Sequence, residues 1–224
     1  MKDEALNFDL EPSFLALANK CASETMTSIE RQYALWQAVR HIARRGIEGD
    51  VVECGVWRGG SVMLAAMTLL EERDTDRTLW LYDTFEGMTP PSDADVQEMS
   101  GRKAADVLAE DELFRCVAAR DIVEKNIAST GYPHVRIVEG DILQTIPANV
   151  PERIALLRLD TDWYATTRHE LEHLYPRLVK GGVLIIDDYG YWRGARQATD
   201  EYFAAIDDAP LLHRIDYTGR VAVK

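Results

Sequence analysis

Short apolar runs alternate with helical patterns along most of this chain. Apolar runs that end at turn residues predict strands over residues 50–55, 78–84, 134–141, 153–162 and 182–189. Apolar residues at three- and four-residue steps predict helices between them. Parallel neighbours need a crossover connection, usually a helix, so the alternation predicts a parallel sheet covered by helices on both faces. We therefore expect one α/β domain.

The predicted helices include one that precedes the first strand. Within it, apolar residues from Ile29 to Ile42 recur at helical spacing, and Gly46 and Gly49 follow as stop signals. The predicted helices cover residues 13–46, 61–73, 112–130, 166–181 and 195–206.

Two segments depart from the alternation. Residues 211–224 predict two strands around a Thr-Gly turn, which must run antiparallel to each other. Residues 88–111 are polar, acidic and poorly periodic, so we expect a loop or lid there. We divide the chain into an N-terminal helical extension, residues 1–49, and a main domain, residues 50–224, with the lid as an insertion.

The composition excludes several classes of partner. The chain has 38 acidic and 25 basic residues, a net charge of −13, which repels nucleic acid but is compatible with a bound cation. Cys21, Cys54 and Cys116 are widely separated, which favours free thiols over disulfides or a zinc site. The first residues lack a signal-peptide pattern, and no stretch approaches the ~18 apolar residues of a membrane helix. We expect a cytoplasmic protein with no membrane partner.

A glycine-rich turn follows the first predicted strand, in the sequence VVECGVWRGGS. Gly55, Gly59 and Gly60 permit a sharp turn and close approach of a ligand to the backbone. The spacing matches neither the dinucleotide fingerprint nor a P-loop. Glu53 ends the strand, where a carboxylate disfavours a pyrophosphate but suits a ligand with an ammonium or sulfonium charge.

Acidic residues also end the next two predicted strands. Asp83 could accept hydrogen bonds from both hydroxyls of a ribose, and Gly140-Asp141 could reach an adenine edge. An acid at a strand end is as often a helix cap as a ligand contact. The order of the three sites along the chain favours a ligand with amine, ribose and adenine groups, which describes S-adenosylmethionine.

Four further acids follow the last two parallel strands. Asp160 and Asp162 end the run ALLRLDTD, and Asp187 and Asp188 end the run GGVLIIDD. Ligands gather at the carboxyl ends of parallel strands. The two pairs could converge on a metal ion, or they could begin two helices.

Five motifs lie between about Thr25 and Phe203, namely TMTSIER, VECGVWRGGS, YDTFEGM, LLRLDTDWYATT and GGVLIIDDYG. Together they resemble the macrocin O-methyltransferase (TylF-type) family. The resemblance implies an enzyme that methylates sugar hydroxyls of antibiotics and related glycosides with S-adenosylmethionine and magnesium. It also implies the Rossmann-like fold of class I methyltransferases, with seven mostly parallel strands and an antiparallel last strand.

The resemblance also implies which residues bind the cofactor. Thr25 and Met26 would contact its methionine end, Asp83 its ribose, and Asp141 with Ile142 its adenine. The full set that the resemblance assigns to the cofactor is Thr25, Met26, Glu53, Gly55, Gly59, Ser61, Asp83, Thr84, Phe85, Asp141, Ile142 and Asp160.

The four acids fit the chemistry of a hydroxyl acceptor. A hydroxyl must lose its proton as it attacks a methyl group, and a divalent cation stabilises the developing alkoxide. Asp160, Asp187 and Asp188 could bind magnesium, which prefers oxygen ligands. The resemblance assigns Asp162 as the general base, whereas its position before a helix also allows a capping role.

Several alternatives remain at this stage. His169 and His173 have metal-like spacing, but a solvated or half-buried helix face explains them better. The acceptor could be a catechol instead of a sugar, because the metal chemistry is the same. A haloacid-dehalogenase-type phosphatase would use Asp160-Thr161-Asp162 but leaves the glycine-rich turn unexplained. A non-catalytic cofactor-binding module would not need Asp162. We expect a homo-oligomer that acts on a small glycoside.

Overall fold

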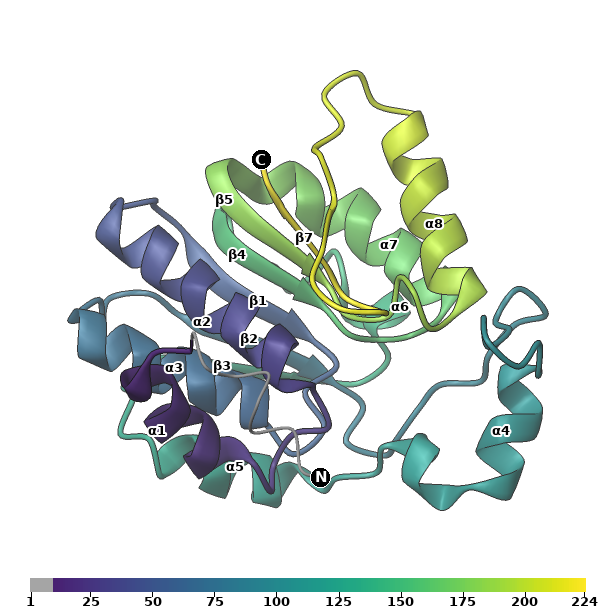
Figure 1. Cartoon of the computed structure of the whole chain (residues 1–224), viewed down its shortest axis with the longest axis horizontal. Helices are drawn as coiled ribbons and strands as arrows, with labels where there is room; N and C mark the ends of the chain where they lie inside the picture. Colours follow the sequence, from purple (N-terminus) through teal and green to yellow (C-terminus); the bar gives the residue numbers. More distant parts are fainter. Residues whose placement is uncertain (1–9) are drawn as a thin grey trace.

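Seven strands form one sheet in the order β3-β2-β1-β4-β5-β7-β6 (Figure 1). This computed structural model describes residues 10–224. Strands β1 to β5 run parallel to one another, and β7 runs antiparallel to its neighbours β5 and β6. The strands are β1 (Asp50–Cys54), β2 (Leu79–Asp83), β3 (Val135–Glu139), β4 (Ile154–Leu159), β5 (Leu178–Ile186), β6 (His213–Arg214) and β7 (Arg220–Val223).

Helices cover both faces of the sheet, as the alternation predicts (Figure 1). Four helices share one apolar core with the sheet, namely α1 (Pro12–Cys21), α2 (Ile29–Arg44), α3 (Gly60–Glu72) and α5 (Arg120–Ala128). The other face has its own core, to which three helices contribute, namely α6 (Ile142–Thr145), α7 (Tyr164–Leu174) and α8 (Arg193–Ala204).

The central strand β4 separates these two cores. All of its residues are buried. Ala155 and Leu156 pack in the core with α2 and α3, whereas Leu157 and Leu159 pack in the core with α7 and α8. A strand covered on both faces is a nearly continuous apolar run, and Arg158 is the one polar residue within β4. Asp160 follows as soon as the strand leaves the core.

The single helix predicted over residues 13–46 is wrong, because the structure has two helices there. Residues 22–28 separate the two helices. Within this segment, the carbonyl of Glu24 accepts a hydrogen bond of 2.8 Å from the Gly60 amide. Ser28 then begins α2, since its hydroxyl accepts a hydrogen bond from the Arg31 amide. The interruption places residues 24–27 over the glycine-rich turn.

Two other predicted helices differ from the observed ones in their extent. Helix α7 stops at Leu174 and not at Gly181, because Pro176 follows in a short 3₁₀ turn, Tyr175–Arg177, and β5 starts directly after it. Residues 112–130 are not one helix but a 3₁₀ turn, Glu112–Arg115, followed by α5. Cys116, with a left-handed φ of 51°, ends that turn.

The insertion at residues 88–111 is more ordered than a simple loop. It contains α4 (Ala104–Glu110) and two isolated β-bridges, which pair Val96 with Lys103 and Gln97 with Trp192. Only Ala104 and Val107 of α4 are buried, so its sequence shows little helical periodicity. Whether the insertion moves as a lid stays a prediction.

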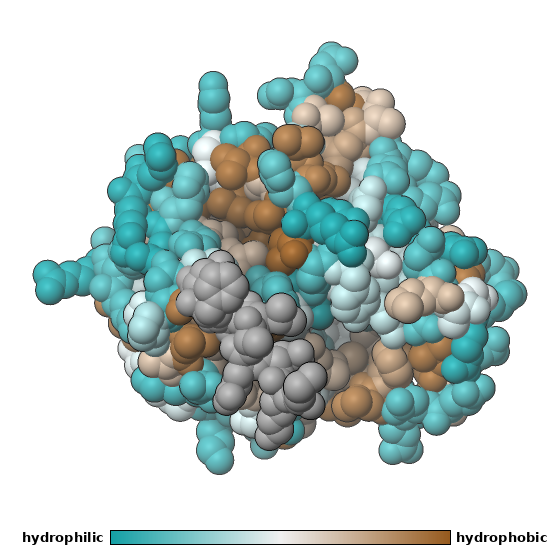
Figure 2. Space-filling view, viewed as in Figure 1, coloured by the Kyte–Doolittle hydropathy of each residue, from teal (hydrophilic) through white to brown (hydrophobic). Residues whose placement is uncertain are grey.

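Hydrophilic residues cover most of the face shown in Figure 2, and hydrophobic residues gather toward its centre. Among residues 10–224, no helix has both the length and the apolar character needed to cross a membrane. Residues 1–9, part of the predicted N-terminal extension, lie outside the described residues.

The N-terminal helices belong to the main core, which gives a stability prediction. Phe14 is fully buried and its ring lies 5.0 Å from Tyr33 and 5.6 Å from Trp36. We expect Phe14→Ala to lower the free energy of unfolding by about 3–5 kcal/mol, in one urea transition. Exposed Asn19 on the same helix is the control, and Asn19→Ala should change it by less than about 0.5 kcal/mol. A separate early transition of these helices would contradict a shared core.

Candidate active site

A cavity of about 370 Å³ opens at the carboxyl ends of the parallel strands. This is the edge at which ligands bind in open α/β sheets. The sequence-predicted residues that line it are Thr25, Met26, Glu53, Gly55, Ser61, Asp83, Thr84, Ile142, Asp160, Asp162, Asp187 and Asp188. Three others do not line it, namely Gly59, Phe85 and Asp141.

The glycine-rich turn brings the ends of β1 and β4 together. Gly55 has a φ of 81°, and a Cβ there would lie 2.0 Å from the carbonyl oxygen of Asp160. A Cβ on Gly60 would lie 2.4 Å from the carbonyl oxygen of Glu24. Both positions therefore need glycine for close backbone approach. Gly59, with a φ of 86°, faces Val123 and not the cavity.

Asp83 ties this turn to the end of β2. One carboxylate oxygen accepts hydrogen bonds from the amides of Val56 (2.8 Å) and Trp57 (3.0 Å), and the other from the amide of Phe85 (2.8 Å). Burial raises the pKa of Asp83, and these backbone hydrogen bonds oppose the rise. The second oxygen, with one amide donor, keeps capacity for a further donor in the cavity.

Asp141 caps a helix, which is the alternative role considered for an acid at a strand end. Its carboxylate accepts a hydrogen bond of 2.9 Å from the Leu143 amide at the start of α6. Its neighbours Gly140 and Ile142 reach the cavity instead.

Three of the predicted acids converge. Ligand oxygens of Asp160, Asp187 and Asp188 all lie within 4.8 Å of one another. One carboxylate oxygen of Asp188 is buried without a hydrogen-bond partner. A buried unpaired carboxylate oxygen is costly, and a set of hard oxygen donors suits a magnesium ion. The residues present therefore fit the predicted metal ion.

Two arginines, which the sequence analysis did not single out, form ion pairs within this acidic cluster, and one of them is fully buried. Arg158 on β4 forms ion pairs with Glu53, Asp160 (2.6 Å) and Asp187, and donates a hydrogen bond of 3.2 Å to the Thr27 hydroxyl. Only 2% of Arg158 is exposed. An arginine inside the apolar run ALLRL was the signal that could have revealed it, because a buried arginine needs carboxylate partners.

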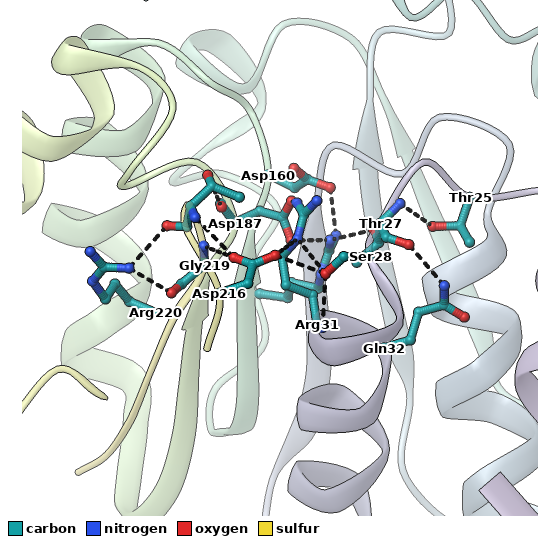
Figure 3. A network of polar contacts seen from close by, with 12 residues as sticks. Thr25, Thr27, Ser28, Arg31, Gln32, Asp160, Asp187, Asp216, Gly219 and Arg220 are labelled. Atoms are coloured by element: carbon teal, nitrogen blue, oxygen red, sulfur yellow. Dashed lines mark hydrogen bonds and ion pairs between the residues drawn. The ribbon is translucent and has the colours of Figure 1, made fainter. Parts of the chain in front are cut away.

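The second arginine, Arg31 on α2, links distant parts of the chain (Figure 3). It forms an ion pair with the second carboxylate oxygen of Asp187 and another, of 3.1 Å, with Asp216. Asp216 also accepts a hydrogen bond of 2.8 Å from the Ser28 hydroxyl. The N-terminal helix and the turn before β7 are thus joined at the acidic cluster.

Burial dominates the electrostatics of the acids. It raises the pKa of Asp160 to about 6 and that of Glu53 to about 8, although the positive charge of Arg158 opposes both shifts. Burial also raises the pKa values of Asp162 and Asp188 well above normal, and the negative charges of neighbouring aspartates add to the rise. The cluster has fewer cations than a fully ionised set of carboxylates requires.

Asp162 does not cap α7, so the capping alternative is wrong. The N-cap position of α7 is Trp163, and its side chain accepts no hydrogen bond from the helix. The Tyr164 amide instead donates a hydrogen bond of 2.8 Å to Asp95 of the insertion. Asp162 has a left-handed φ of 67° and lines the cavity beside the acidic cluster. Asp95 is a buried residue beside the site that the sequence analysis did not single out, since it lies in a segment without periodicity.

The two histidines lie away from the metal candidate. His169 and His173 stack edge-on at 4.4 Å on α7, and His169 contacts the carbonyl of Ile146 at 3.1 Å. This agrees with the half-buried helix face predicted for them.

Aromatic side chains form a wall of the cavity next to the acids. The rings of Tyr191 and Phe114 stack at 6.5 Å, and Tyr217 lies 6.5 Å from Tyr191. Trp192 packs edge-on against Trp163 at 5.1 Å. All five line the cavity. Such a wall can receive the apolar face of an acceptor.

The sheet order, the antiparallel β7 and the strand-end acids define a class I methyltransferase. The chain belongs to the macrocin O-methyltransferase (TylF) family, whose model matches residues 13–223. The demethyldecarbamoylnovobiocin O-methyltransferase of Streptomyces niveus is 33% identical over 202 residues, which cover 88% of this chain and 74% of that protein. The mycinamicin III 3″-O-methyltransferase of Micromonospora griseorubida is 35% identical over 188 residues, 80% of this chain and 70% of that protein.

Solved structures agree with this assignment. The O-methyltransferase NovP matches with a TM-score of 0.77 and 31% identity, over 90% of this chain and 82% of that chain. The calicheamicin methyltransferase CalS11 shares the fold, with a TM-score of 0.69, 17% identity, and coverage of 95% and 93%. The predicted family, fold class and O-methyltransferase activity are confirmed. The phosphatase and the non-catalytic module do not agree with this family.

The burial of Arg158 predicts a large cost for its removal. We expect Arg158→Met to lower the free energy of unfolding by about 3–5 kcal/mol at pH 8, because Glu53 and two aspartates lose their buried cation. The loss should be smaller at pH 5. Burial raises the pKa values of these carboxyl groups in the folded state, so at pH 5 they bind protons and need the arginine less, whereas at pH 8 more of them are ionised. The exposed pair of Arg153 with Glu48 is the control, and Arg153→Met should cost less than about 1 kcal/mol. Equal small losses for both variants in urea titrations would contradict this account.

Proposed function

We propose that this O-methyltransferase uses S-adenosylmethionine and one magnesium ion to methylate a hydroxyl of a vicinal diol on a sugar. The acceptor is a glycosylated natural product or related glycoside. The observation that carries the proposal is the group of Asp160, Asp187 and Asp188, with Asp162 beside it, in the same cavity as the glycine-rich turn. A relative from Streptomyces olivaceus, 34% identical over 217 residues, is named for the 4′-oxygen of a rhamnosyl tetracenomycin.

The cofactor half of the cavity suits S-adenosylmethionine. Glu53 and the glycine-rich turn would face its amino acid end, together with Thr25 and Met26 from the segment before α2. Asp83 would accept a ribose hydroxyl through the oxygen that has a single amide donor. Gly140 and Ile142 would border the adenine, and the hydrogen bond of Asp141 to α6 would hold that segment in place.

The acceptor half of the cavity suits an activated hydroxyl. Asp160, Asp187 and Asp188 would hold the magnesium ion, which when bound lowers the cost of forming an alkoxide. Asp162 would take the proton of the acceptor hydroxyl as the hydroxyl oxygen bonds to the methyl carbon and the carbon–sulfur bond breaks, which leaves S-adenosylhomocysteine. Burial raises the pKa of Asp162, and the positive charge of a bound magnesium ion would oppose that rise and keep the carboxylate ionised, as a proton acceptor must be. Arg31 and Arg158 orient Asp187 through its two carboxylate oxygens.

The insertion, residues 88–111, would cover the acceptor. Met88 and Thr89 line the cavity, and Trp163 donates a hydrogen bond of 2.8 Å from its indole to the carbonyl of Thr89. Closure over the site would exclude water from a reactive sulfonium. We also propose a cytoplasmic homo-oligomer that binds neither nucleic acid nor membranes.

A catechol acceptor is the second candidate, because the aromatic wall of Phe114, Tyr191 and Tyr217 could stack on a planar ring. A panel of rhamnosides, other deoxysugar glycosides and catechols tests the acceptor class, with S-adenosylhomocysteine release as the readout. Turnover on glycosides with no turnover on catechols supports the proposal. The reverse pattern would replace it with the second candidate.

We expect Asp162→Asn to lose about 10²–10⁴ in rate, the usual contribution of a general base. The amide keeps the shape and the left-handed backbone but cannot accept the proton. Magnesium and cofactor should still bind, as calorimetry would show. Asp93→Asn on the exposed surface of the insertion is the control and should keep full activity. Full activity of Asp162→Asn would remove Asp162 from the mechanism.

We expect Asp83→Ala to weaken S-adenosylmethionine binding, because the ribose loses a charged acceptor and the turn loses its two amide contacts, from Val56 and Trp57. Asp50→Ala is the matched control. Asp50 accepts hydrogen bonds from the Thr78 amide and the Trp80 indole, both 2.9 Å, at the opposite edge of the sheet. Calorimetry should show unchanged affinity for the control. Wild-type affinity in Asp83→Ala would contradict the ribose assignment.

A further inference from the structure

Asp95 is a buried carboxylate in the insertion, and its side chain contacts the start of α7. It has no exposed surface. One carboxylate oxygen accepts a hydrogen bond of 2.8 Å from the Tyr164 amide, and the other accepts two of 2.7 Å from the amide and hydroxyl of Ser92. Its backbone carbonyl accepts a hydrogen bond of 2.8 Å from Ala104, where α4 begins. Asp95 therefore joins the insertion to the residue two positions after Asp162.

The contact matters because of what aspartates elsewhere in this chain do. An aspartate commonly accepts a hydrogen bond from the amide two residues further on. Four aspartates here make that contact, at 2.8 to 2.9 Å, namely Asp83, Asp111, Asp141 and Asp216. The Tyr164 amide is likewise two residues after Asp162, but it donates its hydrogen bond to Asp95.

Gly194 at the start of α8 makes room for this contact. A Cβ at Gly194 would lie 1.9 Å from the carboxylate oxygen of Asp95 and 3.0 Å from the Tyr164 nitrogen. Its φ is not in the left-handed region, so close packing rather than backbone conformation requires glycine here. The first turns of α7 and α8 thus converge on one carboxylate.

We propose that Asp95 is a positioning residue that keeps Asp162 directed at the acidic cluster. Asp95 accepts the hydrogen bond of the Tyr164 amide. That amide is then not available to the Asp162 carboxylate, which would otherwise turn toward it. Asp162 then remains beside Asp160 and Asp188 in the cavity. This inference rests on the proposed role of Asp162 as general base.

The surrounding contacts keep Asp95 in place. The Arg193 amide donates a hydrogen bond of 2.9 Å to the carbonyl of Val96, and the Glu98 amide donates one of 2.8 Å to the carbonyl of Tyr191. The insertion is therefore attached at residues 95–98 to the start of α8. If the insertion moves as a lid, the moving part would exclude residues 95–98. Movement of these residues would break the hydrogen bond between Asp95 and the Tyr164 amide, and Asp162 would be free to turn toward that amide.

A double-mutant cycle with Asp95→Ala and Asp162→Gly tests the inference. Glycine removes the carboxylate and tolerates the left-handed backbone at residue 162. We expect Asp95→Ala to lower kcat about 10- to 100-fold, as small misplacements of a catalytic group do, with an unchanged KM for S-adenosylmethionine. The double variant should be no slower than Asp162→Gly alone. Asp95→Asn should restore most of the rate, because its amide oxygen can still accept the Tyr164 amide.

Two further variants separate positioning from general loss of stability. Gly194→Ala should reproduce the kcat loss, because its Cβ displaces the carboxylate of Asp95. Asp50→Ala, which also removes an acceptor of one backbone amide and one side-chain donor, should lower the melting temperature without changing kcat. A kcat loss in Asp50→Ala equal to that in Asp95→Ala would overturn the positioning role.

Amide hydrogen exchange at Tyr164, measured by NMR without substrate, provides a readout independent of activity. Protection should persist in Asp95→Ala, where Asp162 replaces the acceptor, and disappear in the double variant. Loss of protection in Asp95→Ala alone would overturn the inference, as would kcat losses that multiply in the cycle. A fully active Asp162→Gly would instead overturn the proposed function, and the positioning role with it.

Discussion

The ion pairs of buried Arg158 with Glu53, Asp160 and Asp187 are the interaction on which the rest of the site depends. Carboxylates of three strands, β1, β4 and β5, meet at one edge of the sheet, where burial disfavours their charged forms. A single guanidinium binds all three strand ends together. It leaves Asp188 and Asp162 without a cation of their own, and this shortage of positive charge is what makes a divalent ion fit.

Distant segments of the chain close around this cluster. Arg31 brings α2 and the turn before β7 to Asp187, so the N-terminal helices and the C-terminal strands both contribute to one site. Asp95 attaches the insertion to the start of α7 from the other side. The peripheral segments therefore do more than cover the sheet, because each of them makes a polar contact at or beside the acidic cluster.

The sequence predicts the sheet and the strand-end acids, because buried parallel strands are continuous apolar runs that stop where the core stops. It does not predict that residues 13–46 form two helices, since the break depends on the contact between Glu24 and Gly60. It also does not distinguish Asp141, which contacts α6, from Asp162, which leaves its helix uncapped. That difference depends on Asp95, which is 67 residues away in the chain and lies in a segment without a pattern.

We propose that the acidic cluster is a magnesium site that activates the acceptor hydroxyl. The most direct measurement is the rate of S-adenosylhomocysteine release with a glycoside acceptor, after complete chelation and then during a magnesium titration. The account predicts a rate at background in chelator and full recovery as magnesium saturates the site. A full rate in chelator would contradict it.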